Sequence, residues 1–167
     1  MATRRRLHRV IRSTIGGVVV ALALGGEMPV AADADHVVRL TQTGCQFLEP
    51  ENGVDRGFEP RSAEDCNRIN AETGDQRLAD AETLELAPGV YTFRVTNTDV
   101  PYELGFWLRE HDYQIGNPLH KLTKVSVSGG GLYQGQTKDY AVDLDPGVYL
   151  YSCPLNPTPN YKLIVKG

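Results

Sequence analysis

Apolar and polar residues alternate along several short segments of the chain, a pattern typical of strands with one buried face. In the segment PYELGFWL, for example, Tyr102, Leu104, Phe106 and Leu108 fall on one face. Turn residues such as Pro-Gly, Asn and Asp separate the segments. The strands predicted in this way cover residues 36–42, 82–87, 90–97, 101–108, 140–144, 148–153 and 161–165. Because no long amphipathic helix lies between them, we expect an all-β sandwich or barrel.

One inserted segment has helical character. Ser62 and Asp65 have the spacing of a capping box, and Gly74 is a suitable end for the helix. Cys66 falls on the same helical face as Ala63, so we expect its side chain to point at the sandwich. The whole stretch 48–80 is too polar to form a core of its own. It is therefore predicted to lie against the strands as a flap with a short helix.

The amino-terminal residues differ from the rest of the chain. A basic segment with five arginines precedes an apolar run over 15–24, and small residues follow. This order is typical of a secretory signal peptide over residues 1–32, and the apolar run is short for a membrane span. Paired arginines at 4–6 leave both general secretion and twin-arginine export open. We expect a mature domain over 33–167, exported to the periplasm or secreted, without a membrane span.

The distribution of charged residues limits the kinds of partner that the predicted mature domain can bind. Of the 17 Lys and Arg residues, five lie in the first 32, and of the 21 Asp and Glu residues only Glu27 does. Residues 33–167 therefore hold 12 basic and 20 acidic side chains. An acidic domain of this kind disfavours nucleic acid as a partner, because phosphates are neutralised by Lys and Arg.

Three cysteines remain in the predicted mature chain: Cys45, Cys66 and Cys153. An oxidising compartment favours one disulfide and one remaining thiol. A Cys45–Cys66 bond would attach the flap to the first strand and contribute about 3 kcal/mol to stability. A Cys45–Cys153 bond is the alternative.

The carboxy-terminal stretch PGVYLYSCPLNPTPNYKLIV places a cysteine at the end of a strand, before a proline-rich loop and a last strand. With TNTDVPYELGF in the middle of the chain, this arrangement resembles the cupredoxins, small Greek-key β-sandwich copper proteins. The loop after Cys153 holds no His or Met, Tyr102 stands where the pattern has a histidine, and no Met follows Met28. A blue-copper site is therefore not expected.

The chain is more similar to the cupredoxin-type domain of periplasmic Efe-type iron-uptake proteins. That resemblance matches Cys45 in TGCQF, Glu103 in PYELGF and Cys153 in YSCPL, and it implies a metal site formed by these three residues. Two thiolates and a carboxylate suit copper(I) or zinc better than hard cations. Either disulfide would remove Cys45 from the ligand set.

Two functions follow as hypotheses. The first is an exported cupredoxin-like protein that binds copper or a similar soft metal at a non-blue site, in metal handling or electron transfer with a periplasmic redox or metal-transport protein. The second is a metal-free interaction module, an accessory subunit stabilised by a disulfide. No enzyme motif occurs in the chain, so catalysis is not expected. The glycine-rich segment 128–135 is interpreted as a flexible hairpin tip or docking loop, and Trp107 as packing under the flap.

Overall fold

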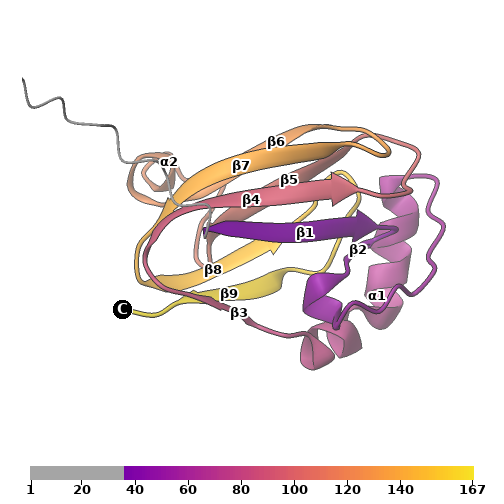
Figure 1. The fold of residues 1–167 in the computed structure, drawn as a ribbon, viewed down its shortest axis with the longest axis horizontal. Helices are drawn as coiled ribbons and strands as arrows, with labels where there is room; N and C mark the ends of the chain where they lie inside the picture. The colour runs from indigo at the N-terminus through magenta and orange to yellow at the C-terminus, as the bar shows by residue number, and fades with distance from the viewer. Residues whose placement is uncertain (1–35) are drawn as a thin grey trace, which may run out of the picture. The chain divides into compact units, whose positions relative to one another are not determined.

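The computed structural model describes residues 36–167, which form a sandwich of two β-sheets with a helical insertion (Figure 1). The four-stranded sheet has the order β2-β1-β4-β7, and the five-stranded sheet has the order β3-β9-β8-β5-β6. The strands are β1 Val37–Thr43, β2 Gln46–Phe47, β3 Leu84–Leu86, β4 Gly89–Asn97, β5 Leu104–Glu110, β6 Ser126–Leu132, β7 Thr137–Leu144, β8 Gly147–Ser152 and β9 Tyr161–Val165. The prediction of an all-β sandwich with a helical insertion is confirmed. The predicted signal peptide over 1–32 lies outside the described residues.

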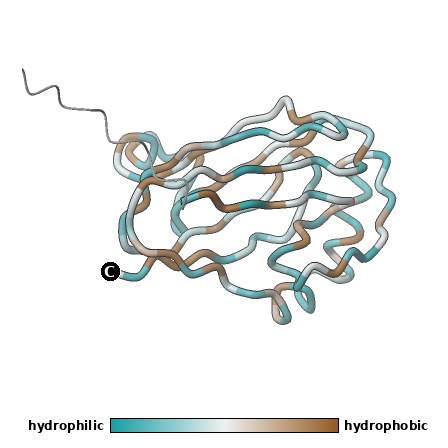
Figure 2. Tube along the Cα trace, in the orientation of Figure 1, coloured by the Kyte–Doolittle hydropathy of each residue, from teal (hydrophilic) through white to brown (hydrophobic). Residues whose placement is uncertain are grey.

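The alternation of apolar and polar residues in the sequence matches the alternation of buried and exposed side chains in the strands. In β4 the side chains of Tyr91, Phe93 and Val95 are buried, whereas Val90 is exposed. Aromatic rings from both sheets meet between the layers, and Phe106 of β5 stacks on Phe93 of β4 at 5.5 Å between ring centroids. Figure 2 shows the corresponding alternation of apolar and polar positions along the strands. Burial of apolar side chains between the sheets is therefore the main source of stability.

Two strand pairs are parallel, which explains where the insertion lies. Strand β1 pairs with β4 in parallel, from Val37 opposite Thr92 to Gln42 opposite Asn97. Parallel neighbours cannot be joined by a tight hairpin, so the chain needs a long crossover between them. Residues 48–83 form much of this crossover, and they contain the short 3-10 helix η1 Glu49–Glu51 and the helix α1 Ala63–Asp80.

Helix α1 is longer than the sequence predicted. The helix begins after Ser62 as expected, but it continues through Gly74 to Asp80. A glycine inside a helix costs about 1 kcal/mol relative to alanine. Buried contacts of Arg77, one turn further on, offset this cost and hold the last turns in place. The expectation that Gly74 ends the helix was therefore wrong.

The structure also tests three smaller predictions. Most of the glycine-rich segment 128–135 is not a flexible loop, because β6 runs to Leu132 and pairs with β5. Trp107 does not pack under the flap: its ring lies against Tyr113 and its indole N–H donates to Ser126. The position of Tyr149 two residues after the Pro-Gly turn predicts that its hydroxyl packs back against the turn backbone, and this is confirmed, because the hydroxyl donates to the Asp145 carbonyl at 2.9 Å.

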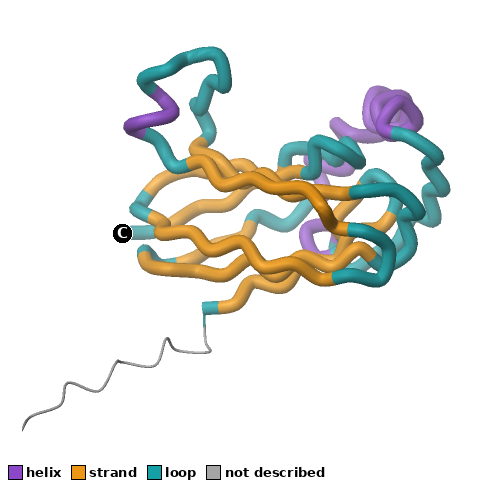
Figure 3. Tube along the Cα trace, turned by 90° about the horizontal axis from the view of Figure 1, so that it is seen from above, coloured by secondary structure: helices purple, strands orange, loops and turns teal. Residues whose placement is uncertain are grey.

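The connection from β5 to β6 is an exposed excursion with one short helix, α2 His120–Thr123. Its apolar side chains Ile115, Leu119 and Leu122 are largely exposed to solvent. In Figure 3 this excursion and α1 rise from the same side of the sandwich, at opposite ends of it. No helix within residues 36–167 is both long and apolar enough to cross a membrane.

Candidate functional site

Cys45 and Cys66 form a disulfide bond, which is one of the two pairings that the sequence left open. Cys45 lies in the tight turn between β1 and β2 with a positive φ of 60°. Cys66 lies in the first turns of α1 and is fully buried. The bond therefore attaches the inserted helix covalently to the end of the first strand.

Asn156, in the loop after Cys153, connects all three cysteines. Its Oδ1 accepts hydrogen bonds from the Cys45 N–H at 3.1 Å and the Tyr102 hydroxyl at 3.0 Å, and it lies 3.0 Å from Cys66 Sγ. Its Nδ2 donates to the Thr43 carbonyl, and its backbone N–H donates to Cys153 Sγ at 3.2 Å. The three cysteines thus surround one buried amide at one end of the sandwich.

Sequence reasoning did not single out Asn156. Its position between the prolines of the PLNPTP loop was the available signal, because such a loop holds its backbone in few conformations. The role of its side chain depends on segments about 90 and 110 residues away along the chain, which no local pattern reveals.

Cys153 is a buried thiol, and it is the free cysteine of the described chain. Its Sγ accepts hydrogen bonds from the Gly105 N–H at 3.3 Å and from the Asn156 N–H. Burial raises the pKa of Cys153, and the backbone N–H groups of Gly105, Asn156 and Leu155 oppose that shift without cancelling it. Cys153 is therefore a protonated thiol at neutral pH.

Glu103 lies just before β5 and is exposed to solvent. Its Oε1 accepts a hydrogen bond from the Gly131 N–H at 2.6 Å, and its Oε2 accepts one from the Tyr133 hydroxyl at 3.4 Å. The carboxylate therefore holds the turn between β6 and β7.

These contacts test whether the residues present suit copper. Of the three predicted ligands, Cys45 is bonded to Cys66, Cys153 is a buried thiol, and Glu103 contacts another turn. Within residues 36–167, no group of three or more His, Cys, Asp or Glu side chains is placed to hold a metal ion. With the disulfide formed, the donor set does not fit copper(I), which prefers available thiolates.

A buried ion pair holds the insertion against the sandwich. Arg77 of α1 donates to Glu51 Oε1 through both Nε and Nη2, at 2.9 and 2.6 Å, and the two side chains are 2% and 0% exposed. The Tyr161 hydroxyl donates to the same oxygen, and Arg56 donates to Glu51 Oε2. Burial by itself would raise the pKa of Glu51, but the hydrogen bonds from Arg77, Arg56 and Tyr161 outweigh it, so the pKa is lowered.

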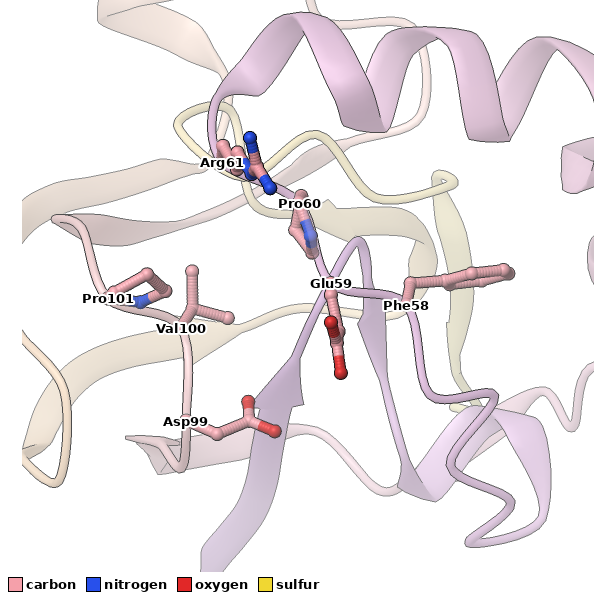
Figure 4. Close-up of a pocket in the computed structure, with 7 residues that line it drawn as sticks. All are labelled: Phe58, Glu59, Pro60, Arg61, Asp99, Val100 and Pro101. Atoms are coloured by element: carbon pink, nitrogen blue, oxygen red, sulfur yellow. The ribbon is translucent and has the colours of Figure 1, made fainter.

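A surface pocket of about 370 Å³ lies between the flap and the β4–β5 turn. Figure 4 shows the carboxylates of Glu59 and Asp99 directed into the same opening, with Arg61 at its other side. Burial, and then the charge of Asp55, raise the pKa of Asp99. All the hydrogen-bonding groups that line this pocket belong to exposed side chains, which is typical of a solvated surface.

Comparisons with known proteins place the fold in context. A scan against protein-family models finds no match, and a search of curated proteins finds none either. Among solved structures, auracyanin B is similar with a TM-score of 0.49 and 13% identity, over 86% of this chain and 97% of that one. A multicopper oxidase from Pediococcus acidilactici gives a TM-score of 0.38 at 11% identity, over 90% of this chain and 30% of that one. Fet3p, a multicopper oxidase that functions in iron import, gives a TM-score of 0.36 at 13% identity, over 81% of this chain and 32% of that one.

The chain thus spans about a third of either oxidase. At these scores and identities the three matches carry no information about the activity of this chain. The class that the coordinates define is an all-β sandwich, tied to an inserted helix by a disulfide. The resemblance to the Efe-type domain stays a prediction.

Proposed function

We propose that the protein is an exported, metal-free interaction module, a disulfide-stabilised sandwich that serves as an accessory subunit. The observation that carries this proposal is the Cys45–Cys66 bond, which uses one predicted metal ligand for a structural purpose. Disulfides persist in oxidising compartments, which supports export by the predicted leader.

The arrangement of the other polar groups supports the same function. Cys153 is enclosed by backbone donors, and its raised pKa disfavours the thiolate that a soft metal requires. Exposed apolar side chains lie on the excursion before β6, at Ile115, Leu119 and Leu122, and at Val148 on the outer face of the five-stranded sheet. Both surfaces suit contacts with another protein.

Metal and thiol analysis of the purified protein tests this proposal. We expect less than one copper or zinc ion per ten chains after incubation with Cu(I) or Zn(II) and desalting, and one reactive thiol per chain after unfolding without reductant. One tightly held metal per chain, lost in both Cys153→Ser and Glu103→Ala, would overturn the proposal. A matched control is Glu85→Ala, since this exposed carboxylate lies on the edge strand β3.

One observation favours the copper hypothesis as a second candidate. The Sγ atom of Cys153 accepts two backbone hydrogen bonds, an environment that also suits a metal-bound thiolate. Reduction of the disulfide would return the Cys45 and Cys66 thiols to the surroundings of Asn156. The metal measurement repeated after reduction with a phosphine tests this candidate: metal uptake under reducing conditions alone would support it, and no uptake in either state would contradict it.

A further inference from the structure

The guanidinium of Arg109 is a buried cation without a counter-charge. Arg109 is 9% exposed, and its Cζ atom lies over the Trp107 ring, 3.8 Å from the ring centroid. Nη1 donates to the Ser152 hydroxyl at 3.2 Å and Nη2 donates to Asn160 Oδ1 at 2.7 Å, so both hydrogen-bond partners are neutral. Within residues 36–167, no carboxylate lies within ion-pair distance of Arg109. A charge removed from water in this way is costly unless an opposite charge reaches it.

A second cation lies in the same row of the five-stranded sheet. Arg109 of β5 is opposite Leu150 of β8, and Leu150 is opposite Lys162 of β9. Neighbouring strands are about 4.8 Å apart, so the two cationic positions lie about 10 Å apart. Lys162 is exposed and, among the described residues, forms no ion pair. On the outer face of the other sheet the situation is different, because Arg94 forms a two-point ion pair with Asp139.

Two hollows lie on this face, and one of them is lined by two residues of the row itself. One hollow of about 300 Å³ is lined by Leu150, Asn160 and Lys162 together with Leu78 near the end of α1. The other, of about 240 Å³, is lined by Trp107, Tyr113 and Ile115 with Ser126 of β6. The excursion that carries α2 and the helix α1 rise on this side of the sandwich, as Figure 3 shows. The outer face of the five-stranded sheet therefore carries an aromatic hollow beside Trp107 and a second hollow lined by Lys162, with Arg109 in the strand between them. We refer to this surface as the Arg109–Lys162 face.

The net charge of the domain limits the kinds of molecule that can bind on this face. Residues 33–167 hold 20 acidic and 12 basic side chains, so a polyanion such as nucleic acid or an anionic membrane is repelled at long range. A short carboxylate-bearing segment is repelled by the same net charge at long range, but salt screens that repulsion beyond about 10 Å, and at contact the segment faces the cations Arg109 and Lys162. Glu82, which also lines the hollow beside α1, is not within ion-pair distance of Lys162 and leaves that ammonium available.

We propose that the Arg109–Lys162 face is the docking surface for an acidic segment of a partner protein, with a carboxylate held by Arg109 and Lys162 and an apolar side chain beside Trp107. The proposal rests on the function proposed above and names its surface and the chemistry of its partner. Arg109 provides the specificity for a carboxylate. Its hydrogen-bond partners are neutral, and its guanidinium has further N–H groups that can donate to a carboxylate.

The chain offers a direct reporter for this proposal, because Trp107 is its single tryptophan. The probe is an acetylated, amidated decapeptide of alternating Glu and Leu, and the matched probe replaces Glu with Lys. We expect the acidic peptide to change Trp107 fluorescence saturably and the basic peptide to have no effect. Lys162→Glu should weaken the Kd of the acidic peptide about tenfold, because it replaces attraction with repulsion at an exposed position.

Arg39→Glu is the matched control, since it reverses an exposed cation on β1 of the opposite sheet and should leave the Kd unchanged. Arg109→Gln should abolish binding, and its melting temperature shows whether the variant is folded. No saturable change with the acidic peptide, equal binding of both peptides, or a Kd that Lys162→Glu leaves unchanged would each overturn the proposal. If the protein is metal-free with one reactive thiol but does not bind the acidic peptide as expected, the docking surface is ruled out and the proposed function still stands.

Discussion

Arg77 Nη2 lies 2.6 Å from Glu51 Oε1 in the interior, and this ion pair joins α1 to the 3-10 helix η1 at the start of the insertion. Arg77 Nη2 also donates to the Cys45 carbonyl at 2.9 Å, next to the disulfide. The insertion is thus held at the same place by a covalent bond and by a buried charge pair.

Removal of the cation should destabilise the protein strongly. In Arg77→Met the Glu51 carboxylate keeps only Arg56 and Tyr161 as partners, so we expect a loss of about 3 kcal/mol in the free energy of unfolding. Urea unfolding followed by circular dichroism measures it. The double variant Arg77→Met/Glu51→Gln should lose less than the sum of the two single losses, because no buried charge is left alone. Additive losses would contradict this coupling.

The Arg77–Glu51 pair also predicts that the stability of the protein depends on pH. The pKa of Glu51 is lower in the folded protein than in the unfolded chain. Its contribution is therefore fully present above the unfolded pKa and is lost as the pH falls through the folded pKa. We expect the difference in unfolding free energy between the wild type and Glu51→Gln to be largest near pH 7 and to shrink steadily below about pH 4. A difference that is constant from pH 7 to pH 3 would rule out the charge as its source.

The disulfide should contribute measurably to stability. It closes a loop with a sequence separation of 21 residues, for which the chain-entropy estimate is about 3 kcal/mol. Cys66→Ala should lower the urea midpoint and make it insensitive to dithiothreitol. In Cys153→Ala, by contrast, dithiothreitol should still lower the midpoint, since the disulfide is intact. Sensitivity to reductant that disappears in Cys153→Ala would show a different pairing.

The close approach of the flap to the β1–β2 turn should make Gly44 intolerant of a side chain. A Cβ atom on Gly44 would overlap the carbonyl oxygen of Phe58 and approach Pro60. Because backbone atoms must move to relieve the overlap, Gly44→Ala should cost about 1–3 kcal/mol in unfolding free energy. Gly116→Ala is the control, since nothing lies within 4 Å of its added Cβ, and we expect a change within about 0.5 kcal/mol. Equal stability of the two variants would show that the flap is not held where the structure places it.

The sequence by itself determined the class of fold and most of the strands, although it did not predict β2 and β6. Alternation places Phe93 and Phe106 on buried faces whatever the partner strand, because period 2 is a property of the extended backbone. The helical pattern that directs Cys66 at the sandwich also made a Cys45–Cys66 bond one of two pairings to consider, and the structure contains it.

Only the tertiary structure decided how long α1 is and which polar groups it buries. Arg77 lies past a glycine in a polar stretch, and nothing local distinguishes it from an exposed arginine. Its burial depends on Glu51 and Tyr161, which are 26 residues before it and 84 residues after it. Contacts over such separations depend on how distant strands pack, so local periodicity does not encode them. The same reason explains why Asn156 among the cysteines, and Arg109 without a counter-charge, emerged only from the folded chain.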